Sequence, residues 1–148
     1  MFSWAARPKA EVKQAGFVST VFGRRIHIPA IHSKSGAERQ FGERAAINAP
    51  IQGAAADIIR RAMIRMPAAL EAAGLSFQQE AVAGDRSGGV KMLLQVHDEL
   101  VFECPDALAD TAIPVIRRVM EGAAEPAVAL SVPLVVEARA AKNWDEAH

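Results

Sequence analysis

The sequence predicts an α+β fold, with a mostly antiparallel sheet packed against helices. Two short apolar runs flank Gly23, and two more are separated by only three residues near position 98. Both patterns are typical of hairpins. Residues 37–70 and 105–122 instead carry apolar side chains at the 3.6-residue spacing of helices. Hairpin, helices, hairpin, helix and a last strand therefore follow one another along the chain, which favours one α+β layer.

The first hairpin is predicted over residues 17–29. Its strands are rich in β-branched residues, Gly23 permits the turn, and Pro29 ends the second strand.

The segment from Ala37 to about Leu70 is predicted as helix with a break. Pro50 cannot donate a hydrogen bond to the carbonyl four residues earlier, so two helices are expected rather than one. Asn48 would then cap the second helix. Its solvated face is expected to hold three arginines, Arg60, Arg61 and Arg65.

The second hairpin is predicted from strands at residues 90–96 and 100–103, after a flexible loop over 74–89. Alternation along the first strand predicts one strongly buried face, made of Val90, Met92, Leu94 and Val96. A helix should follow Pro105, kink at Pro114 and end at Gly122. Residues 132–138 are predicted as a last strand.

Composition limits the protein class. The 148 residues are 51% apolar, which suits one folded domain and excludes a disordered chain. A run of eighteen apolar residues and a signal-peptide pattern are both absent from the sequence. The single cysteine, Cys104, excludes an intramolecular disulfide framework. These features predict a cytoplasmic protein with no membrane partner.

Charge is distributed unevenly. Residues 1–65 contain 11 Lys and Arg against 4 Asp and Glu, whereas residues 91–148 contain 5 against 10. A basic first half indicates a polyanionic partner, and an arginine-rich solvated surface is the alternative.

Two adjacent carboxylates, Asp98 and Glu99, lie at the predicted tip of the second hairpin. Neighbouring negative charges repel each other, and bound Mg²⁺ would relieve that repulsion. The alternative is a solvated turn with ordinary acidic residues.

Several ordered segments resemble the C-terminal palm region of family A DNA polymerases. The resemblance runs from about Gly16 to His148, and the segments that carry it are Gly23–Arg25, Glu43–Met63, Gln95–Val101 and Asn143–His148.

The resemblance implies DNA-templated nucleotidyl transfer to a primer 3′-hydroxyl in DNA replication and repair, with two Mg²⁺ ions. It implies that Asp98 is the principal metal ligand and that Glu99 supports it. It places His97 near the primer terminus, where a hydrogen-bonded turn histidine is the alternative.

Three further positions match residues that face the primer–template in the family: Arg44, Asn48 and Gln52. Amide side chains can reach minor-groove acceptors that all correct base pairs share, and Arg suits phosphate or groove contacts. The alternative makes Asn48 a helix cap and Gln52 a surface residue.

The resemblance also implies an incomplete polymerase. Residues 1–148 are expected to be a C-terminal fragment of the polymerase domain, with residues 1–15 poorly matched. The earlier palm motif with its own metal-binding aspartate is missing, and so is the fingers helix that grips the deoxynucleoside triphosphate. The isolated chain is therefore expected to be inactive, with the missing N-terminal half as a partner.

Two other functions remain open. A non-catalytic DNA-binding module derived from a polymerase would bind duplex without adding nucleotides. A metal phosphohydrolase would use a His-Asp pair such as His97 and Asp98, but it needs further ligands from helices.

Overall fold

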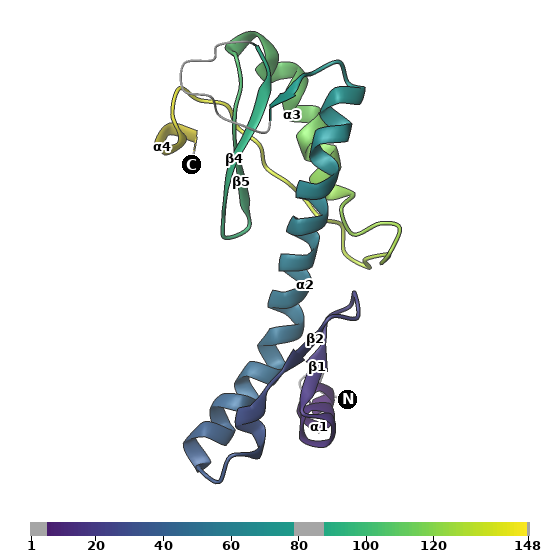
Figure 1. Cartoon of the computed structure of the whole chain (residues 1–148), viewed down its shortest axis with the longest axis vertical. Coiled ribbons are helices and arrows are strands. Elements are labelled where there is room, and N and C mark those ends of the chain that lie inside the picture. Colours follow the sequence, from purple (N-terminus) through teal and green to yellow (C-terminus); the bar gives the residue numbers. More distant parts are fainter. Residues whose placement is uncertain (1–5, 79–87, 148) are drawn as a thin grey trace. The chain divides into compact units, whose positions relative to one another are not determined.

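The computed structural model describes residues 6–78 and 88–147 (Figure 1). The chain divides into two compact units, Met1–Asp57 and Ile58–His148. Helix α2, Gly36–Ala72, contributes to both.

In the first unit, α1 (Ala6–Ala15) is followed by β1 (Phe17–Ser19) and β2 (Arg25–His27). The two strands pair antiparallel, with Val18 opposite Ile26, as the sequence predicted. Gly23 has a φ of +83°, a backbone conformation that glycine adopts without a Cβ penalty. A short 3₁₀ helix, η1 (Pro29–His32), leads into α2.

One face of α2 packs against the hairpin and η1 through small residues. Ala46 is fully buried in a cluster with Val18 and Ile31. A Cβ built on Gly53 would lie 2.7 Å from Cγ2 of Thr20, and one built on Gly42 would lie 2.9 Å from the backbone nitrogen of Ile31. Glycine therefore leaves room for the backbone of η1 at position 42 and for side chains of the hairpin at position 53.

The predicted break at Pro50 is wrong. Helix α2 continues without interruption through Asn48 and Pro50, so Asn48 is an interior helical residue rather than a cap. An interior proline costs about 3 kcal/mol of helix stability. The buried contacts of Ala46 and Gly53, on either side of Pro50, offset this cost, because tertiary packing supplies most of a helix's stability in proteins.

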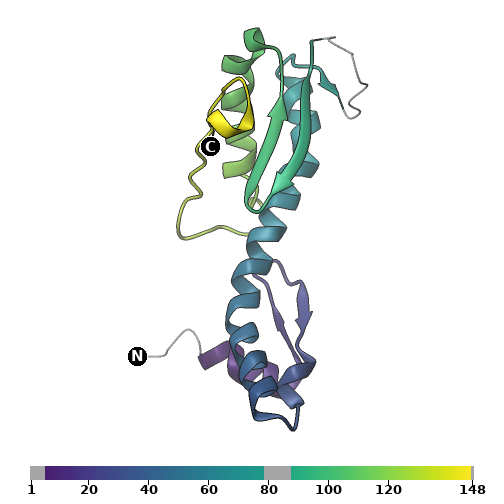
Figure 2. The ribbon, with the colours of Figure 1, turned by 90° about the vertical axis from the view of Figure 1, so that its left-hand side faces the viewer.

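The second unit contains a three-stranded sheet in the order β3-β4-β5 (Figure 2). Strand β3 is Phe77–Gln78, β4 is Val90–Val96 and β5 is Glu99–Glu103. Strand β4 pairs antiparallel with β5, as predicted, and parallel with β3. Part of the predicted 74–89 loop is thus a strand, and residues 79–87 of that loop lie outside the described residues.

The predicted buried face of β4 is only partly correct. Val90 is fully buried, but Leu94 is 45% exposed. A register shift between Met92 and Leu94 inserts Leu93 as an extra residue. Such a bulge disrupts the two-residue alternation of a strand, so the side chains beyond it no longer follow the predicted pattern.

Helix α3 (Asp106–Glu121) covers the sheet. It continues through Pro114 and ends at Gly122, the predicted end. The core of this unit unites α2, the sheet and α3, and its buried members are Met66, Leu70, Leu75, Val90, Ala112, Val115 and Ile116.

The predicted strand at residues 132–138 is wrong, since this segment forms no ladder with any described strand. It leads to α4 (Trp144–Ala147) as an irregular, extended chain. The local sequence suits a strand, but a strand also needs a partner for its backbone groups.

The prediction that three arginines of α2 lie on a solvated face is wrong for Arg61 and Arg65. Arg61 Nε donates a hydrogen bond of 2.8 Å to the carbonyl of Ala123, and Arg65 Nη2 donates to the carbonyl of Glu125. Both side chains are half-buried and secure the turn that follows α3, whereas Arg60 is exposed. Within the described residues, no helix combines the length and the apolar character that crossing a membrane requires.

Candidate functional site

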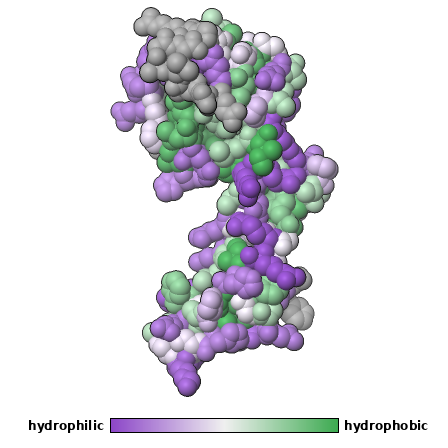
Figure 3. Space-filling view, viewed as in Figure 1, coloured by the Kyte–Doolittle hydropathy of each residue, from purple (hydrophilic) through white to green (hydrophobic). Residues whose placement is uncertain are grey.

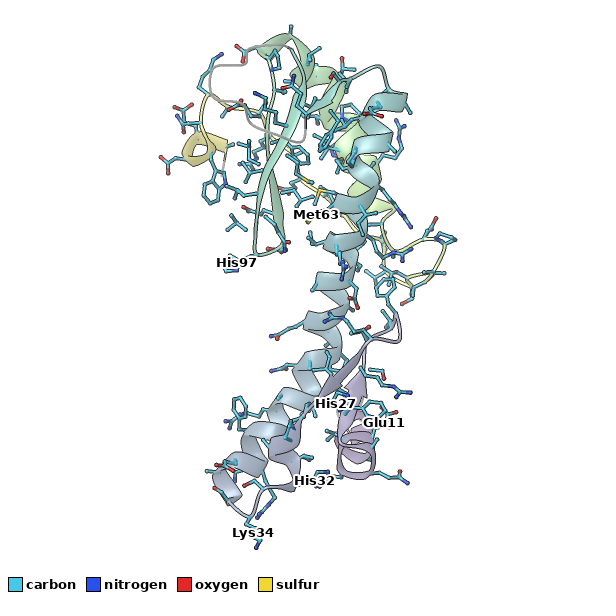
Figure 4. The ribbon with its side chains drawn as sticks, in the orientation of Figure 1. Glu11, His27, His32, Lys34, Met63 and His97 are labelled. Carbon is cyan, nitrogen blue, oxygen red and sulfur yellow. The ribbon has the colours of Figure 1, made fainter. Side chains whose placement is uncertain are left out.

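The turn between β4 and β5 contains only two residues. Val96 pairs with Glu99, which leaves His97 and Asp98 at the tip. His97 has a φ of +52°, and its carbonyl accepts a hydrogen bond of 2.9 Å from Nε2 of Gln95. Figure 4 shows the His97 side chain at the end of the hairpin, directed away from the sheet. The hairpin thus presents Asp98 at a defined position beside a strand end.

The carboxylates at the tip differ in burial. Asp98 is exposed, and Glu99 is half-buried at the start of β5. Described residues form no cluster of three or more His, Cys, Asp or Glu side chains able to hold a metal. Two carboxylates nevertheless suit Mg²⁺, which commonly takes one or two from a protein and fills its shell with water and substrate phosphates. The residues present therefore fit part of a magnesium site.

Arg44, Asn48 and Gln52 all lie on α2 in the first unit, and all three are exposed. Because the helix is continuous, their spacing of four places them along one face. The opposite face, with Gly42, Ala46 and Gly53, is the one packed against the hairpin. The continuity of α2 therefore creates a polar stripe that the predicted break at Pro50 would have divided.

Sequence reasoning missed two apolar members of this stripe. Phe41 is 62% exposed and Ile51 is 59% exposed, and each is three or four residues from a polar member. The space-filling view shows apolar side chains at the surface of this unit among polar ones (Figure 3). Phe41 is three residues before Arg44, and Ile51 is three residues after Asn48. This helical spacing could have placed both residues on the same face from the sequence alone.

The tip of the first hairpin is attached to α2 by a charged network. Nε of Arg24 donates to Oδ1 of Asp57 at 2.8 Å, and its Nη2 donates to the carbonyl of Gly53 at 2.8 Å. The hydroxyl of Thr20 donates to the other oxygen of Asp57 at 2.9 Å. This network holds the hairpin against the helix that carries the polar stripe.

Cys104 follows β5 and is partly buried. Burial raises the pKa of its thiol, and the nearby carboxylates of Asp106 and Glu103 raise it further. A thiol with a raised pKa is a poor nucleophile at neutral pH.

The family model for DNA polymerase family A matches residues 1–146. The chain belongs to DNA polymerase family A. This match includes residues 1–15, which the sequence resemblance did not cover. Membership of DNA polymerase family A also confirms the α+β fold class predicted for the chain.

Relatives in DNA polymerase family A match nearly the whole chain. DNA polymerase I of Rhizobium leguminosarum is 56% identical over 140 residues, which are 95% of this chain and 13% of the relative. DNA polymerase I of Pseudomonas aeruginosa is 45% identical over 148 residues, or 100% of this chain and 14% of the relative. The chain thus spans about one seventh of the length of these relatives.

A solved structure has a similar fold. It is the POL domain of Pol1 from M. smegmatis in complex with DNA primer-template and dNTP. It matches with a TM-score of 0.70 and 38% identity, covering 88% of this chain and 20% of that chain. The chain therefore has the fold of the matching part of that POL domain.

Proposed function

We propose that this chain supplies one carboxylate motif and part of the primer–template surface of a DNA-templated DNA polymerase. The activity is nucleotidyl transfer to a primer 3′-hydroxyl, in DNA replication and repair. The observation that carries the proposal is the two-residue turn that presents Asp98 at the hairpin tip, in a chain of this family. The remainder of the polymerase is the expected partner, together with primer–template DNA and a deoxynucleoside triphosphate.

Asp98 and Glu99 are the residues that would hold Mg²⁺. Two such ions stabilise both the attacking and the leaving oxygen of an in-line phosphoryl displacement. Asp98 is exposed at the tip, so its carboxylate is accessible to a metal and to a primer end. Glu99 lies at the start of β5 and adds negative charge beside it.

His97 occupies the first position of the turn. Its exposed imidazole can donate a hydrogen bond to a phosphate or sugar oxygen near the primer terminus. This role requires only that the side chain project from the tip, as Figure 4 shows.

The polar stripe on α2 suits duplex DNA. Arg44 is exposed and has no ion-pair partner among the residues described, so its guanidinium is available to a phosphate or groove acceptor. Asn48 and Gln52 can donate to purine N3 and pyrimidine O2, the minor-groove acceptors common to all correct base pairs. Contacts of this kind check base-pair shape without reading sequence.

Primer extension tests the proposal. The protein to compare with the 148-residue chain is a chimera in which this chain replaces the matching region of R. leguminosarum DNA polymerase I. We expect the chimera to extend a primer in the presence of Mg²⁺. We expect the chain alone to bind primer–template weakly without extending it, because two metals in fixed geometry need more than one carboxylate motif.

The second candidate is a non-catalytic DNA-binding module. It is favoured by the finding that described side chains assemble no complete metal-ligand cluster. A chimera that folds and shifts duplex DNA in a gel, but adds no nucleotide with Mg²⁺, would support this candidate and contradict the polymerase proposal. Robust extension by the chain alone would show that the catalytic metal site has been misplaced.

A further inference from the structure

Helix α2 has a weak point at Pro50, which lies between two residues of the polar stripe, Asn48 and Gln52. Proline has no backbone N–H, so the carbonyl of Ala46 loses the hydrogen bond that residue 50 would donate in a regular helix. Proline is also one of the few causes of sharp kinks in helices. The hydrogen bonds of the helix alone therefore fix the segment that carries Gln52 poorly relative to the segment before Pro50.

The hairpin of β1 and β2 lies alongside α2, as Figure 1 and Figure 2 both show, and contacts it on both sides of Pro50. Before the proline, the fully buried Ala46 belongs to one apolar cluster with residues of the hairpin. After the proline, Nη2 of Arg24 donates a hydrogen bond of 2.8 Å to the carbonyl of Gly53. Nε of the same side chain donates to Oδ1 of Asp57 at 2.8 Å. The hairpin therefore bridges the weak point of the helix.

The tip of this hairpin is closed by hydrogen bonds to the buried Thr20. Its hydroxyl accepts from the backbone N–H groups of Phe22 and Arg24, at 3.3 Å each, and its own N–H donates to the carbonyl of Arg24 at 2.9 Å. The same hydroxyl donates to Oδ2 of Asp57 at 2.9 Å, so both carboxylate oxygens are bonded to the tip. The tip thus fixes the helical turn of residues 53–57, which directly follows Gln52.

The double contact of Arg24 depends on the shape of its guanidinium. This group holds several N–H donors in a rigid planar fork, so one side chain can bond a carboxylate and a carbonyl at the same time. Gly53 and Asp57 are four residues apart and therefore lie on the same face of the helix. A Cβ built on Gly53 would lie 3.3 Å from Nη2 of Arg24, so glycine leaves the approach to the carbonyl open.

We propose that Arg24 and Asp57 are positioning residues for Gln52, and that they determine how strictly it distinguishes a correctly paired primer terminus from a mismatched one. Purine N3 and pyrimidine O2 lie at equivalent positions in all correct pairs, and a mismatch displaces them. A side chain can detect this displacement only if its own position is fixed to within about 0.5 Å. The inference rests on the proposed function, because it takes the polar stripe to face the primer–template.

Mismatch discrimination by the chimera defined above tests the inference. The measured quantity is the ratio of the extension rates from a matched and a mismatched primer terminus. Arg24→Ala should lower this ratio by at least about fivefold, the smallest discrimination expected from one good contact to a base edge. Asp57→Asn keeps the shape of the side chain and should lower the ratio by a smaller factor. An unchanged ratio in both variants would overturn the inference.

Two control variants separate positioning from a loss of stability. Arg25→Ala removes the neighbouring arginine, whose guanidinium lies 4.8 Å from the ring centroid of Phe17 within the hairpin. Ile31→Val destabilises the same unit by removing a methyl group from a buried side chain. Both controls should keep the ratio of the unmodified chimera. A fall in the ratio for Ile31→Val as large as that for Arg24→Ala would assign the effect to stability and contradict the proposal.

A double substitution identifies the residue through which Arg24 acts. Gln52→Ala removes the amide side chain and should lower the ratio of extension rates by itself. If Arg24 acts by holding Gln52 in place, adding Arg24→Ala to Gln52→Ala should lower the ratio no further. Losses that multiply in the double variant, as they do for independent sites, would contradict the proposal.

Binding measured without a nucleotide distinguishes a failure of this inference from a failure of the proposed function. Fluorescence anisotropy gives the preference of the chimera for a matched over a mismatched primer terminus as a ratio of dissociation constants. An inactive chimera that shows this preference, and loses it on Arg24→Ala, would contradict the proposed activity and support the positioning role. In an inactive chimera, the same preference with and without Arg24→Ala would overturn the positioning role.

Discussion

Val96 and Glu99 face each other as partners in the antiparallel ladder, so the turn between them consists of His97 and Asp98 alone. The first turn position has a positive φ, which costs a non-glycine residue about 1–2 kcal/mol. A two-residue turn fixes the register of both strands. The position of Asp98 therefore depends on the conformation of His97.

Substitutions of His97 should show this dependence in the stability of the hairpin. Glycine adopts a positive φ freely, so His97→Gly should leave the free energy of unfolding within about 0.5 kcal/mol of the native value. His97→Val places a β-branched residue in the same conformation and should lower that free energy by about 1–2 kcal/mol. Urea unfolding followed by circular dichroism distinguishes the two, and equal stability of both variants would contradict the turn geometry.

Gly53→Ala should destabilise the first unit. The added Cβ would lie 2.7 Å from Thr20 and 2.9 Å from Ile26, too close for either side chain to remain in place. Overpacking of this kind costs about 1–3 kcal/mol. The matched control is Gly36→Ala at the start of α2, where the nearest atom is 3.9 Å away. We expect thermal unfolding of the control to match the native chain, and an equal loss in both variants would argue against this packing.

Arg44→Ala should weaken binding of primer–template duplex by about three- to tenfold. A lost phosphate contact also reduces the counterions released on binding, so the slope of log K against log salt should fall in magnitude by about 1. Arg117→Ala removes an exposed arginine from the acidic half of the chain and is the control. Fluorescence anisotropy at several salt concentrations measures both quantities. The same loss for both variants would exclude the proposed DNA surface.

Cys104 should react slowly with iodoacetamide at pH 7.5, because its raised pKa leaves little thiolate. The rate should rise about tenfold per pH unit until the pH passes that pKa. Asp106→Asn removes one of the charges that raise the pKa, so alkylation of this variant should be faster at the same pH. Faster alkylation of the native folded chain than of the urea-unfolded chain would contradict the assigned environment.

The hairpin that carries Asp98 was predictable because its evidence is local. Two strand-forming runs separated by three residues leave few alternatives to a tight turn. The bulge at Leu93 was not predictable, since the alternation of apolar residues reads the same with or without an extra residue in the ladder.

The long helix shows where local rules fail. Pro50 has an unfavourable intrinsic effect on a helix, and the sequence alone contains no measure of the packing of Ala46 and Gly53 that offsets it. The segment at residues 132–138 shows the opposite case. Its side chains suit a strand, but strand formation depends on a partner that local sequence does not reveal.

The candidate site was predicted in two steps. The pattern of adjacent carboxylates at a hairpin tip drew attention to Asp98 and Glu99 but is equally compatible with a solvated turn, and their match to a family motif favoured the metal site. Alignment of Arg44, Asn48 and Gln52 on one face required the continuous helix that the structure shows. Phe41 and Ile51 were overlooked because exposed apolar residues are common on protein surfaces.

Primer extension by the chimera with Asp98→Asn is the most direct test of the proposed function. Asparagine keeps the size of the side chain and removes its charge, so a metal would lose its ligand while the hairpin keeps its shape. We predict a loss of at least about 1,000-fold in the extension rate, with duplex binding unchanged. Glu99→Gln removes the neighbouring charge in the same way and should reduce the extension rate less than Asp98→Asn does. Extension by the Asp98→Asn chimera at the rate of the unmodified chimera would contradict the account.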